Sequence, residues 1–379
     1  MADPRDTVEE LCRFERRGPC TDAERRAAAW LHDDLRARGH EAWMETHWVR
    51  PQWALSLALH ATLGVVASAT AVALPAAGLA LALLAAVSLG LEASGRAGLL
   101  RLAFPRRATQ NVLAPAAGDA PLTLLVCARY DAGRRGVLAG DRGRRLAARL
   151  RRRLGGRTPG PRAWLAIACG AVGACAAARL AGVDGLALGV AQFLPTVALL
   201  GGLAFAGDVA ASPLTPGANA GASCAAVALA LHEELAGRPP ERLSPALLLY
   251  GAGESGPHAL RAHLRRERLD PSSTVLLEIA ACGAGTPVHA ARHPQLRAAC
   301  ERAASALGTG ARAPLRRPPT RLPAAAVGCL DGDGIVRRAR QADDTPANLE
   351  AAALEAALDF ALAVVDALDG ELASAPITA

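Results

Sequence analysis

The stretch Leu124–Gly136, LLVCARYDAGRRG, passes from a run of apolar residues into a charged turn. Together with the residues before it, 121–128 forms a nearly continuous apolar run, which is typical of a central strand covered on both faces of a sheet. In α/β proteins, the carboxyl ends of such strands carry functional side chains. The segment therefore predicts a buried strand whose end, around Arg129 and Asp131, faces a site.

Two further apolar runs, at 245–250 and 273–280, have the same strand-like character. Helical patterns follow these strands, and the expected helices cover 220–236, 256–268, 293–307 and 346–369. Near the N-terminus, Thr21 and Glu24 have the spacing of a capping box that starts another helix. Strands that alternate with helices predict an α/β fold with a mostly parallel mixed sheet, sandwiched by helices.

Composition limits the class of protein. The 379 residues suffice for one large domain or two smaller ones, and all 42 basic side chains are arginine. The nine cysteines contain no CxxC pair and are odd in number, which argues against a disulfide framework or a zinc ribbon. We therefore expect a reducing compartment. The first fifty residues are too rich in charge for a signal peptide.

Two long apolar regions predict membrane helices. Residues 53–91 contain no Asp, Glu, Lys or Arg, and about 20 apolar residues span a bilayer core, so this region predicts two helices joined by a tight turn. A second region, 163–206, is interrupted by Arg179 and Asp184 and predicts a second hairpin. Buried core helices are the alternative for both regions, but the unbroken apolar length favours a membrane.

Arginines between the two apolar regions predict the orientation in the cell membrane. Residues 134–162 hold eleven arginines and a single acid, Asp141, whereas the hairpin turns carry almost no charge. By the positive-inside rule, this linker, the soluble domain and both termini are expected on the cytoplasmic side. The arginines would then lie against anionic lipid headgroups. A nucleic-acid partner is disfavoured, because the cluster lacks interleaved aromatic residues and lies between membrane segments.

The predicted organisation is one α/β domain with two membrane insertions. The α/β domain is assembled from residues 1–50, 94–135 and 208–370. The other segments are a transmembrane hairpin at 51–93, an arginine-rich cytoplasmic linker at 136–162, a second transmembrane hairpin at 163–207 and a tail at 371–379.

Motifs in the soluble segments resemble those of metallopeptidase family 28, the di-zinc aminopeptidase-like hydrolases. The similar segments are LCRFERRGPCTDAERRAAAWLHDDLRARGHEA (11–42), QNVLAPAAGDAPLTLLVCARYDAGRRG (110–136), SPLTPGANAGASCAAVALAL (212–231), LLLYGAGESG (247–256), TVLLEIAACGAG (274–285) and RRARQADDTPANLEAAALEAALDF (337–360). Their order covers nearly the whole soluble part of the chain. The family as a whole includes membrane-inserted members.

The resemblance implies a site in which histidines and carboxylates hold two zinc ions that clamp a water molecule. A glutamate takes the proton from that water and passes it to the leaving amine. In the family pattern the first strand ends in His-x-Asp, and here Arg129 takes the place of the histidine while Asp131 is kept. The bridging aspartate falls on Ala220, and the general base falls on Gly253.

The remaining metal positions of the pattern fall on Glu254, Glu278 and Arg340. The two glutamates are retained carboxylate ligands, whereas Arg340 replaces the final histidine. A guanidinium group offers zinc no lone pair, and alanine and glycine offer no side-chain ligand. The resemblance therefore predicts a degenerate site without a catalytic base, a metal or another cofactor. A metal site rebuilt around His258, four residues after Glu254, is an alternative.

The replacements change the charge of the former ligand shell in a consistent direction. Two neutral histidine positions have become positive, at Arg129 and Arg340, and two acidic positions have become neutral. Carboxylates left without metal would repel one another. We therefore predict that the two arginines stand where the metals stood and pair with the retained carboxylates, which are Asp131, Glu254 and Glu278. In the alternative, drift at an abandoned site leaves both arginines pointing into solvent.

These observations favour a membrane-anchored metallopeptidase-like protein that is a catalytically inactive pseudopeptidase and acts in binding or scaffolding. Its partners would be the lipid bilayer together with peptides or an active paralogue, and not nucleic acid. The first alternative is an active zinc-dependent aminopeptidase that hydrolyses peptides. The second is a hydrolase with a metal-free mechanism.

Overall fold

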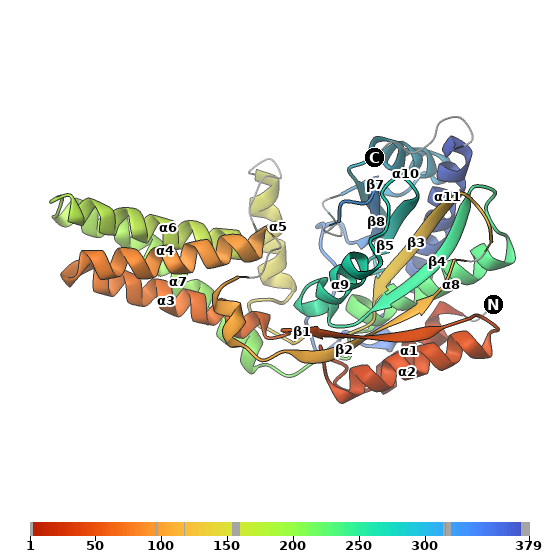
Figure 1. The fold of residues 1–379 in the computed structure, drawn as a ribbon, viewed down its shortest axis with the longest axis horizontal. Helices are drawn as coiled ribbons and strands as arrows, with labels where there is room; N and C mark the ends of the chain where they lie inside the picture. The colour runs from red at the N-terminus through yellow and green to blue at the C-terminus, as the bar shows by residue number, and fades with distance from the viewer. Residues whose placement is uncertain are drawn as a thin grey trace.

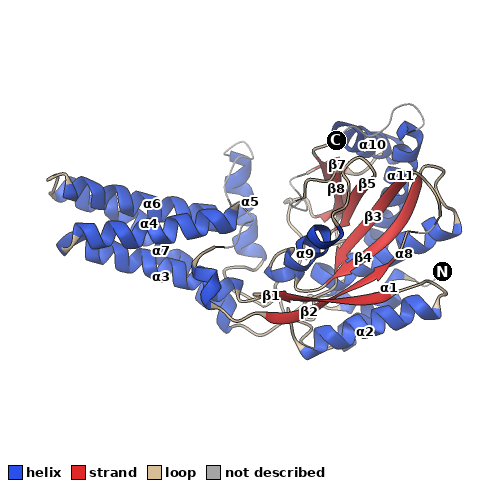
Figure 2. Cartoon of the chain, in the orientation of Figure 1, coloured by secondary structure: helices blue, strands red, loops and turns tan. Residues whose placement is uncertain are grey.

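The computed structural model describes residues 3–94, 98–116, 118–153, 160–313, 315 and 320–372. The molecule is elongated, and a bundle of long helices projects from one end of a domain that combines helices with a sheet (Figure 1). The strands gather in that domain alone (Figure 2).

An eight-stranded sheet forms the centre of the α/β domain. The strands are β1 Trp43–Val49, β2 Arg107–Ala114, β3 Leu122–Arg129, β4 Leu243–Tyr250, β5 Thr274–Ile279, β6 Thr286–Ala291, β7 Ala311–Arg312 and β8 Ala324–Leu330. Their order in the sheet is β1-β2-β4-β3-β5-β8-β6-β7. The central strands β4, β3, β5 and β8 are parallel to one another. Antiparallel pairs join β1 to β2, β2 to β4 and β6 to β8, so the sheet is mixed, as predicted.

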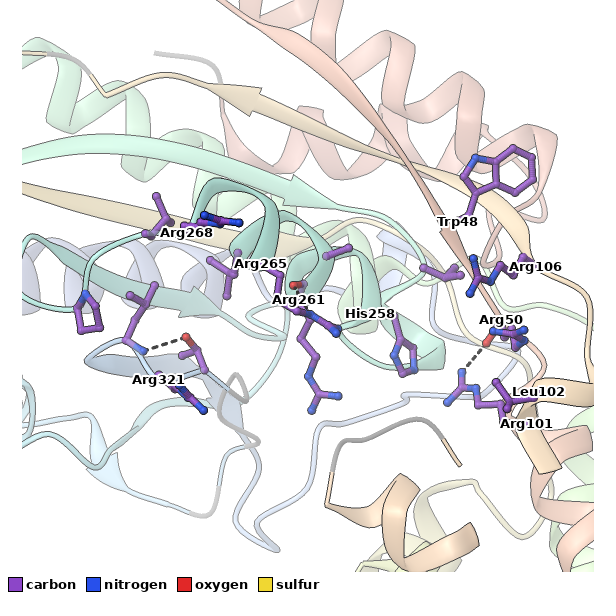
Figure 3. Close-up of a pocket in the computed structure, with 17 residues that line it drawn as sticks. Trp48, Arg50, Arg101, Leu102, Arg106, His258, Arg261, Arg265, Arg268 and Arg321 are labelled. Carbon is purple, nitrogen blue, oxygen red and sulfur yellow. Dashed lines mark hydrogen bonds between the residues drawn. The ribbon is translucent and has the colours of Figure 1, made fainter. Parts of the chain in front are cut away.

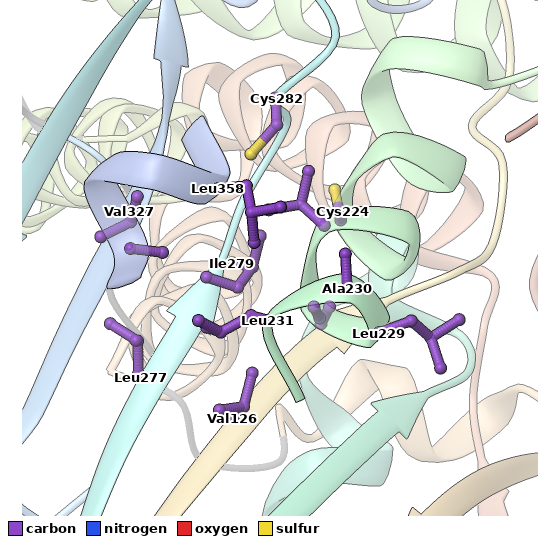
Figure 4. Packing of buried hydrophobic residues seen from close by; sticks show 14 of the residues in the cluster. Val126, Cys224, Leu229, Ala230, Leu231, Leu277, Ile279, Cys282, Val327 and Leu358 are labelled. Atoms are coloured by element: carbon purple, nitrogen blue, oxygen red, sulfur yellow. The ribbon is translucent and has the colours of Figure 1, made fainter. Parts of the chain in front are cut away.

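Helices cover both faces of this sheet. They are α1 Pro4–Arg13, α2 Asp22–Ala37, α8 Ser223–Gly237, α9 His258–Glu267, α10 Pro294–Leu307 and α11 Ala351–Leu372. Alternate side chains of β3 point to opposite faces. Leu124 and Val126 belong to the large core beneath α8 and α11, which Figure 4 shows in part. Leu125 and Cys127 pack on the other face with residues of α9. This burial on both faces explains the nearly continuous apolar run.

The sequence placed some helix boundaries correctly and others wrongly. Thr21 caps α2, because its hydroxyl accepts a hydrogen bond from the Glu24 amide at 3.2 Å, as the capping box predicts. The helix expected from residue 346 begins only at Ala351, because a 3₁₀ turn, η4 Pro346–Asn348, comes first. The helix expected from residue 220 opens as a π-helical turn, η2 Ala218–Ala222, before α8 begins.

Four helices form the projecting bundle. They are α3 Trp53–Ala73, α4 Pro75–Ala93, α6 Pro161–Leu180 and α7 Leu186–Ala211. Each is long and apolar enough to cross a membrane, by length and composition. Small and branched side chains such as Ala82, Cys169 and Leu199 fill the space between them. Only 11% of the most apolar 18-residue stretch of α7 is buried. Most of the apolar surface of α7 therefore faces outward.

The helix α5 Asp141–Arg153 lies across the end of the bundle, beside the α/β domain (Figure 1). The Arg144 guanidinium anchors it there by donating a hydrogen bond of 2.6 Å to the Val336 carbonyl. Leu146 and Leu150, one turn apart, are exposed. Residues 154–159 of the predicted linker and 373–379 of the predicted tail lie outside the described residues.

Candidate functional site

The predicted site positions converge at the carboxyl ends of the parallel strands. Arg129 ends β3, and Glu254 lies in the short turn η3 Gly253–Ser255 that follows β4. Glu278 lies near the end of β5, which pairs with β3. Ala220 comes from η2 and Arg340 from the loop after β8. Neighbouring parallel strands bring their carboxyl ends to one edge, which places these segments together.

Two arginines bind the two oxygens of one carboxylate. The Nη1 atom of Arg129 donates to Oε2 of Glu254 at 2.8 Å, and Nη2 of Arg340 donates to Oε1. The Glu254 side chain is only 9% exposed. The predicted pairing of both arginines with a retained carboxylate is therefore present at Glu254, and the expectation that they point into solvent is wrong.

The other two retained carboxylates lie beside this pair. Asp131 is fully buried, and its Oδ2 accepts a hydrogen bond of 2.9 Å from the amide of Glu254. Burial raises the pKa of Asp131 to about 6, although the positive charge of Arg129 opposes that rise. Glu278 accepts a hydrogen bond of 2.7 Å from the hydroxyl of Tyr250. The charge of Arg129 thus acts on Glu254 and Asp131, whereas the contact shown for Glu278 is with Tyr250.

Arg129 also contacts the turn that carries Ala220. Its Nη2 donates to the backbone carbonyl of Ala220. Burial alone would lower the pKa of Arg129, but Glu254 and Asp131 raise it above its ordinary value, so the guanidinium stays charged. The π-helical turn that carries Ala220 is held by Asp344, whose carboxylate accepts from the Asn219 amide at 2.6 Å. Burial raises the pKa of Asp344 to about 6.

The backbone at Gly253 lies too close to β3 for any side chain. A Cβ atom built at this position would be 2.6 Å from the Cβ of Arg129 and 2.9 Å from Cε2 of Tyr250. Real Cβ atoms essentially never approach a neighbour this closely. The end of β3 and the turn after β4 are therefore tightly packed against each other at Gly253.

The first residue of the bundle forms one wall of the site. The Arg340 guanidinium carbon lies 4.9 Å from the ring centre of Trp53, which is close enough for a cation–π contact. Arg340 holds a left-handed backbone conformation, φ +66°, which costs a non-glycine residue about 1–3 kcal/mol. A cavity of about 150 Å³, lined in part by Trp53, Leu214 and Glu254, remains beside the pair. Pockets for small molecules have volumes of about 300–1,000 Å³.

Glu24 belongs to the site's surroundings, although the sequence pointed only to its capping role. Its carboxylate accepts hydrogen bonds from the amides of Ala252 at 2.6 Å and Cys20 at 2.8 Å, and from the Thr109 hydroxyl at 2.9 Å. Burial raises the pKa of Glu24 to about 8, and the nearby charge of Asp131 adds to the rise. Glu24 thus ties α2 to the turn after β4.

We expect Glu24→Gln to remove a pH dependence of stability. Folding raises the pKa of Glu24 from 4.5 to about 8. Its contribution to the free energy of unfolding is therefore fully present below pH 4.5 and is lost as the pH rises through 8. Glutamine does not titrate. The Tm of the wild-type protein should therefore fall relative to that of Glu24→Gln between pH 5 and pH 8.5. Parallel melting curves across this range would contradict the assignment.

A separate group of metal-capable side chains lies on β1 and α9. Glu45, His263 and Glu267 offer ligand atoms within 4.8 Å of one another. Glu45 already accepts hydrogen bonds from His263 at 2.9 Å and His47 at 3.2 Å, and Arg266 lies 3.8 Å away. Glu45 and His263 are buried whereas Glu267 is exposed, and the contacts already occupy the Glu45 carboxylate. Among the described residues, His258 belongs to no such group.

Comparison of the sequence with protein-family models gives no match, and neither does comparison with the sequences of curated proteins. Solved structures are similar in fold. Glutaminyl cyclase from Porphyromonas gingivalis has a TM-score of 0.53 at 12% identity, covering 96% of each chain. A Zn-dependent exopeptidase from Parabacteroides distasonis has 0.53 at 11% identity and the same coverage.

A zinc aminopeptidase from Bacillus subtilis has a TM-score of 0.54 at 12% identity, covering 96% of this chain and 93% of that chain. At such low identity a likeness shows the fold alone. The protein has a mixed α/β sheet with helices, similar to the folds of zinc-dependent exopeptidases and glutaminyl cyclases.

Proposed function

We propose that this is a membrane-anchored pseudopeptidase that acts by binding or scaffolding. The observation that carries the proposal is the double ion pair at Glu254. Both of its oxygens are bound by guanidinium groups, those of Arg129 and Arg340. In the proposed correspondence, these arginines stand at two zinc-binding histidine positions, and Ala220 and Gly253 stand at the positions of the bridging carboxylate and the base.

The donor set does not fit zinc. Zinc sites use neutral imidazole nitrogens, carboxylate oxygens or thiolates with free lone pairs. Here the best placed carboxylate, Glu254, is occupied by two cations, and a further cation would be repelled by both. Gly253 has no room for a side chain that could serve as the base. We therefore propose that the protein works without zinc or another cofactor.

The size of the cavity favours scaffolding over binding of a peptide at the former site. The volume of about 150 Å³ is below the roughly 300–1,000 Å³ of pockets that hold small molecules. Trp53 and Leu214 help to close this space from the side of the bundle. A partner protein that binds the outer surface of the α/β domain, such as an active paralogue with the same domain, fits this small cavity better than a peptide that would have to enter it.

The bundle supports the membrane part of the proposal. Its four helices carry many exposed apolar side chains, among them Val72, Val87, Ile167, Phe193 and Leu194, which water would not favour. The exposed Leu146 and Leu150 of α5 lie on a helix that crosses the end of the bundle, as an interfacial helix does. With the arginines of α5 on the same side, the positive-inside rule supports our proposal that the α/β domain and both termini are cytoplasmic.

Metal analysis of the purified full-length protein tests the pseudopeptidase proposal. We expect well under 0.1 zinc per chain after dialysis against micromolar zinc, and no cleavage of an aminoacyl reporter. A zinc-containing aminopeptidase of similar fold serves as the positive control for both measurements. Two equivalents of bound zinc together with reporter cleavage would overturn the proposal in favour of an active aminopeptidase.

A further inference from the structure

A second pocket lies apart from the former site, at the junction of the α/β domain and the bundle. It has a volume of about 960 Å³ and is formed by the end of β1, the turn η1 Leu100–Ala103, the start of β2, α9 and the segment before β8. Seven arginines and a histidine line it. They are Arg50, Arg101, Arg106, Arg261, Arg265, Arg268, Arg321 and His258. Among the described residues, no aspartate or glutamate lines this pocket.

Six of the seven arginines form two groups along the pocket, and Arg261 lies between them (Figure 3). The bundle-side group is Arg50, Arg101 and Arg106, and the far group is Arg265, Arg268 and Arg321. Within the bundle-side group, Arg101 donates to the carbonyl of Arg50, and Arg50 donates to the carbonyl of Phe104 at 2.9 Å. These backbone contacts fix the guanidinium groups without neutralising their charge.

The concentration of positive charge is large enough to disturb the ionisation of its members. Arg101 is only 7% exposed, and burial lowers its pKa to about 10. The charge of Glu92 opposes this shift, whereas the charges of Arg162, Arg50 and Arg261 add to it. Burial and the neighbouring arginines lower the pKa of His258 to about 3, which keeps that imidazole neutral. An anion in the pocket would relieve this repulsion. Arginine is suited to phosphate because its planar group can donate two parallel hydrogen bonds.

The position of the pocket indicates the source of the phosphate. Its bundle-side wall lies close in sequence to the ends of two proposed membrane helices, since Arg50 shortly precedes α3 and Arg101 belongs to η1, the next element after α4. Trp48 and Leu102 line the same end and are 65% and 51% exposed. Tryptophan and apolar side chains next to the ends of membrane helices are typical of the interface between a membrane and water. Pockets of basic residues on the cytoplasmic side bind the headgroups of anionic lipids.

We propose that this pocket binds the headgroup of an anionic phospholipid that carries two phosphate groups, one for each arginine group. The proposal rests on the membrane anchoring proposed above and adds a specific lipid to it. It does not depend on the lost zinc site. The bound lipid would hold α9, and with it the face of the sheet that α9 covers, against the membrane surface.

Two matched variants of the full-length protein test the proposal. The pocket variant replaces Arg106, Arg265 and Arg321 by glutamine, and the control variant replaces Arg36, Arg238 and Arg292 by glutamine. All six side chains are exposed, so both variants should fold, and each loses three positive charges. The control arginines do not line the pocket. A difference between the variants therefore reports the pocket and not the net charge.

Binding is measured in detergent solution from the rise in Tm as lipid is titrated. The probes are diphosphatidylglycerol, which has two phosphates, phosphatidylglycerol, which has one, and zwitterionic phosphatidylcholine. For the wild-type protein and the control variant, we expect at least tenfold tighter binding of diphosphatidylglycerol than of phosphatidylglycerol. The pocket variant should lose at least tenfold of that affinity. Equal binding of the three lipids, or equal loss in both variants, would overturn the proposal.

Two further arms identify the source of the anion. Inorganic pyrophosphate, or a single-stranded oligonucleotide, that binds the wild-type protein as tightly as diphosphatidylglycerol would overturn the lipid proposal in favour of a soluble ligand. Carbonate extraction of cell membranes separates this result from failure of the anchoring. Release of the chain by carbonate would overturn both proposals, whereas retention without lipid preference would overturn this one alone.

Discussion

Replacing Arg129 by methionine is expected to lower the free energy of unfolding by about 3–5 kcal/mol, the usual cost of removing one partner from a buried ion pair. Glu254, 9% exposed, would lose one of its two guanidinium partners. Asp131, fully buried, would lose the nearest compensating charge. Methionine retains much of the volume of arginine, so the loss would be mainly electrostatic.

The cost of Arg129→Met should depend on pH. Asp131 has its pKa raised on folding to about 6, so the stability it contributes is lost as the pH rises through that value. Arg129 is one of the groups that holds this pKa down. Without Arg129 the pKa of Asp131 in the folded state rises further, and the loss of stability continues to a higher pH. The difference in Tm between the variant and the wild-type protein should therefore be larger at pH 8 than at pH 5.

Two controls isolate the ion pair. Arg36→Met removes an exposed arginine of α2 and should change the free energy of unfolding by less than about 0.5 kcal/mol. In a double-mutant cycle with Glu254→Gln, the combined loss should fall short of the sum by about 1–3 kcal/mol, because the two groups are in contact. Additive losses of unfolding free energy would contradict an ion pair between Arg129 and Glu254. So would an Arg129→Met protein with the Tm of the wild-type protein.

The sequence predicted the centre of the fold better than its margins. The strands β3, β4 and β5 were found because burial on both faces leaves a run with few polar residues. The strand β8 escaped, because its segment AAAVGCL is rich in alanine, which has little preference for strands. The helix α5 escaped for a different reason. Its many arginines leave only a short apolar stripe, formed by Leu146 and Leu150, which is too weak a pattern to indicate a helix.

Some residues of the candidate site could be predicted from the sequence, and others could not. The convergence of Arg129, Glu254 and Arg340 could be predicted because each stands inside a motif that resembles the family pattern. Glu24 could not, because its capping role accounted for it and its contact with Ala252 spans 228 residues of sequence. Trp53 begins a helix predicted to enter the membrane, and no local pattern connects it to Arg340. Contacts that join distant segments depend on the tertiary fold, and short motifs carry no record of them.

Gly253→Ala is expected to lower the free energy of unfolding by about 3 kcal/mol, the upper part of the range for overpacking. The added Cβ would meet the Cβ of Arg129 at 2.6 Å and Cε2 of Tyr250 at 2.9 Å. Arg129 is held by its ion pair and Tyr250 by its hydrogen bond to Glu278, so neither can give way cheaply. Thermal or denaturant unfolding of the purified variant measures the loss.

Gly370→Ala in α11 is the matched control, because a Cβ there meets nothing within 4 Å. Removing a glycine from a helix should raise stability by up to about 1 kcal/mol.

The same geometry predicts that Gly253→Glu, which restores the glutamate of the family pattern, gains neither zinc nor peptidase activity. The longer side chain starts from the same crowded Cβ, so the backbone of η3 would have to move away from β3 before the carboxylate could reach the site. That movement would pull Glu254 from Arg129, and its cost adds to the overpacking. We expect Gly253→Glu to be at least as unstable as Gly253→Ala and inactive toward an aminoacyl reporter. A Gly253→Glu protein with wild-type Tm would show that the end of β3 and the turn after β4 separate easily, and would contradict the crowding at Gly253.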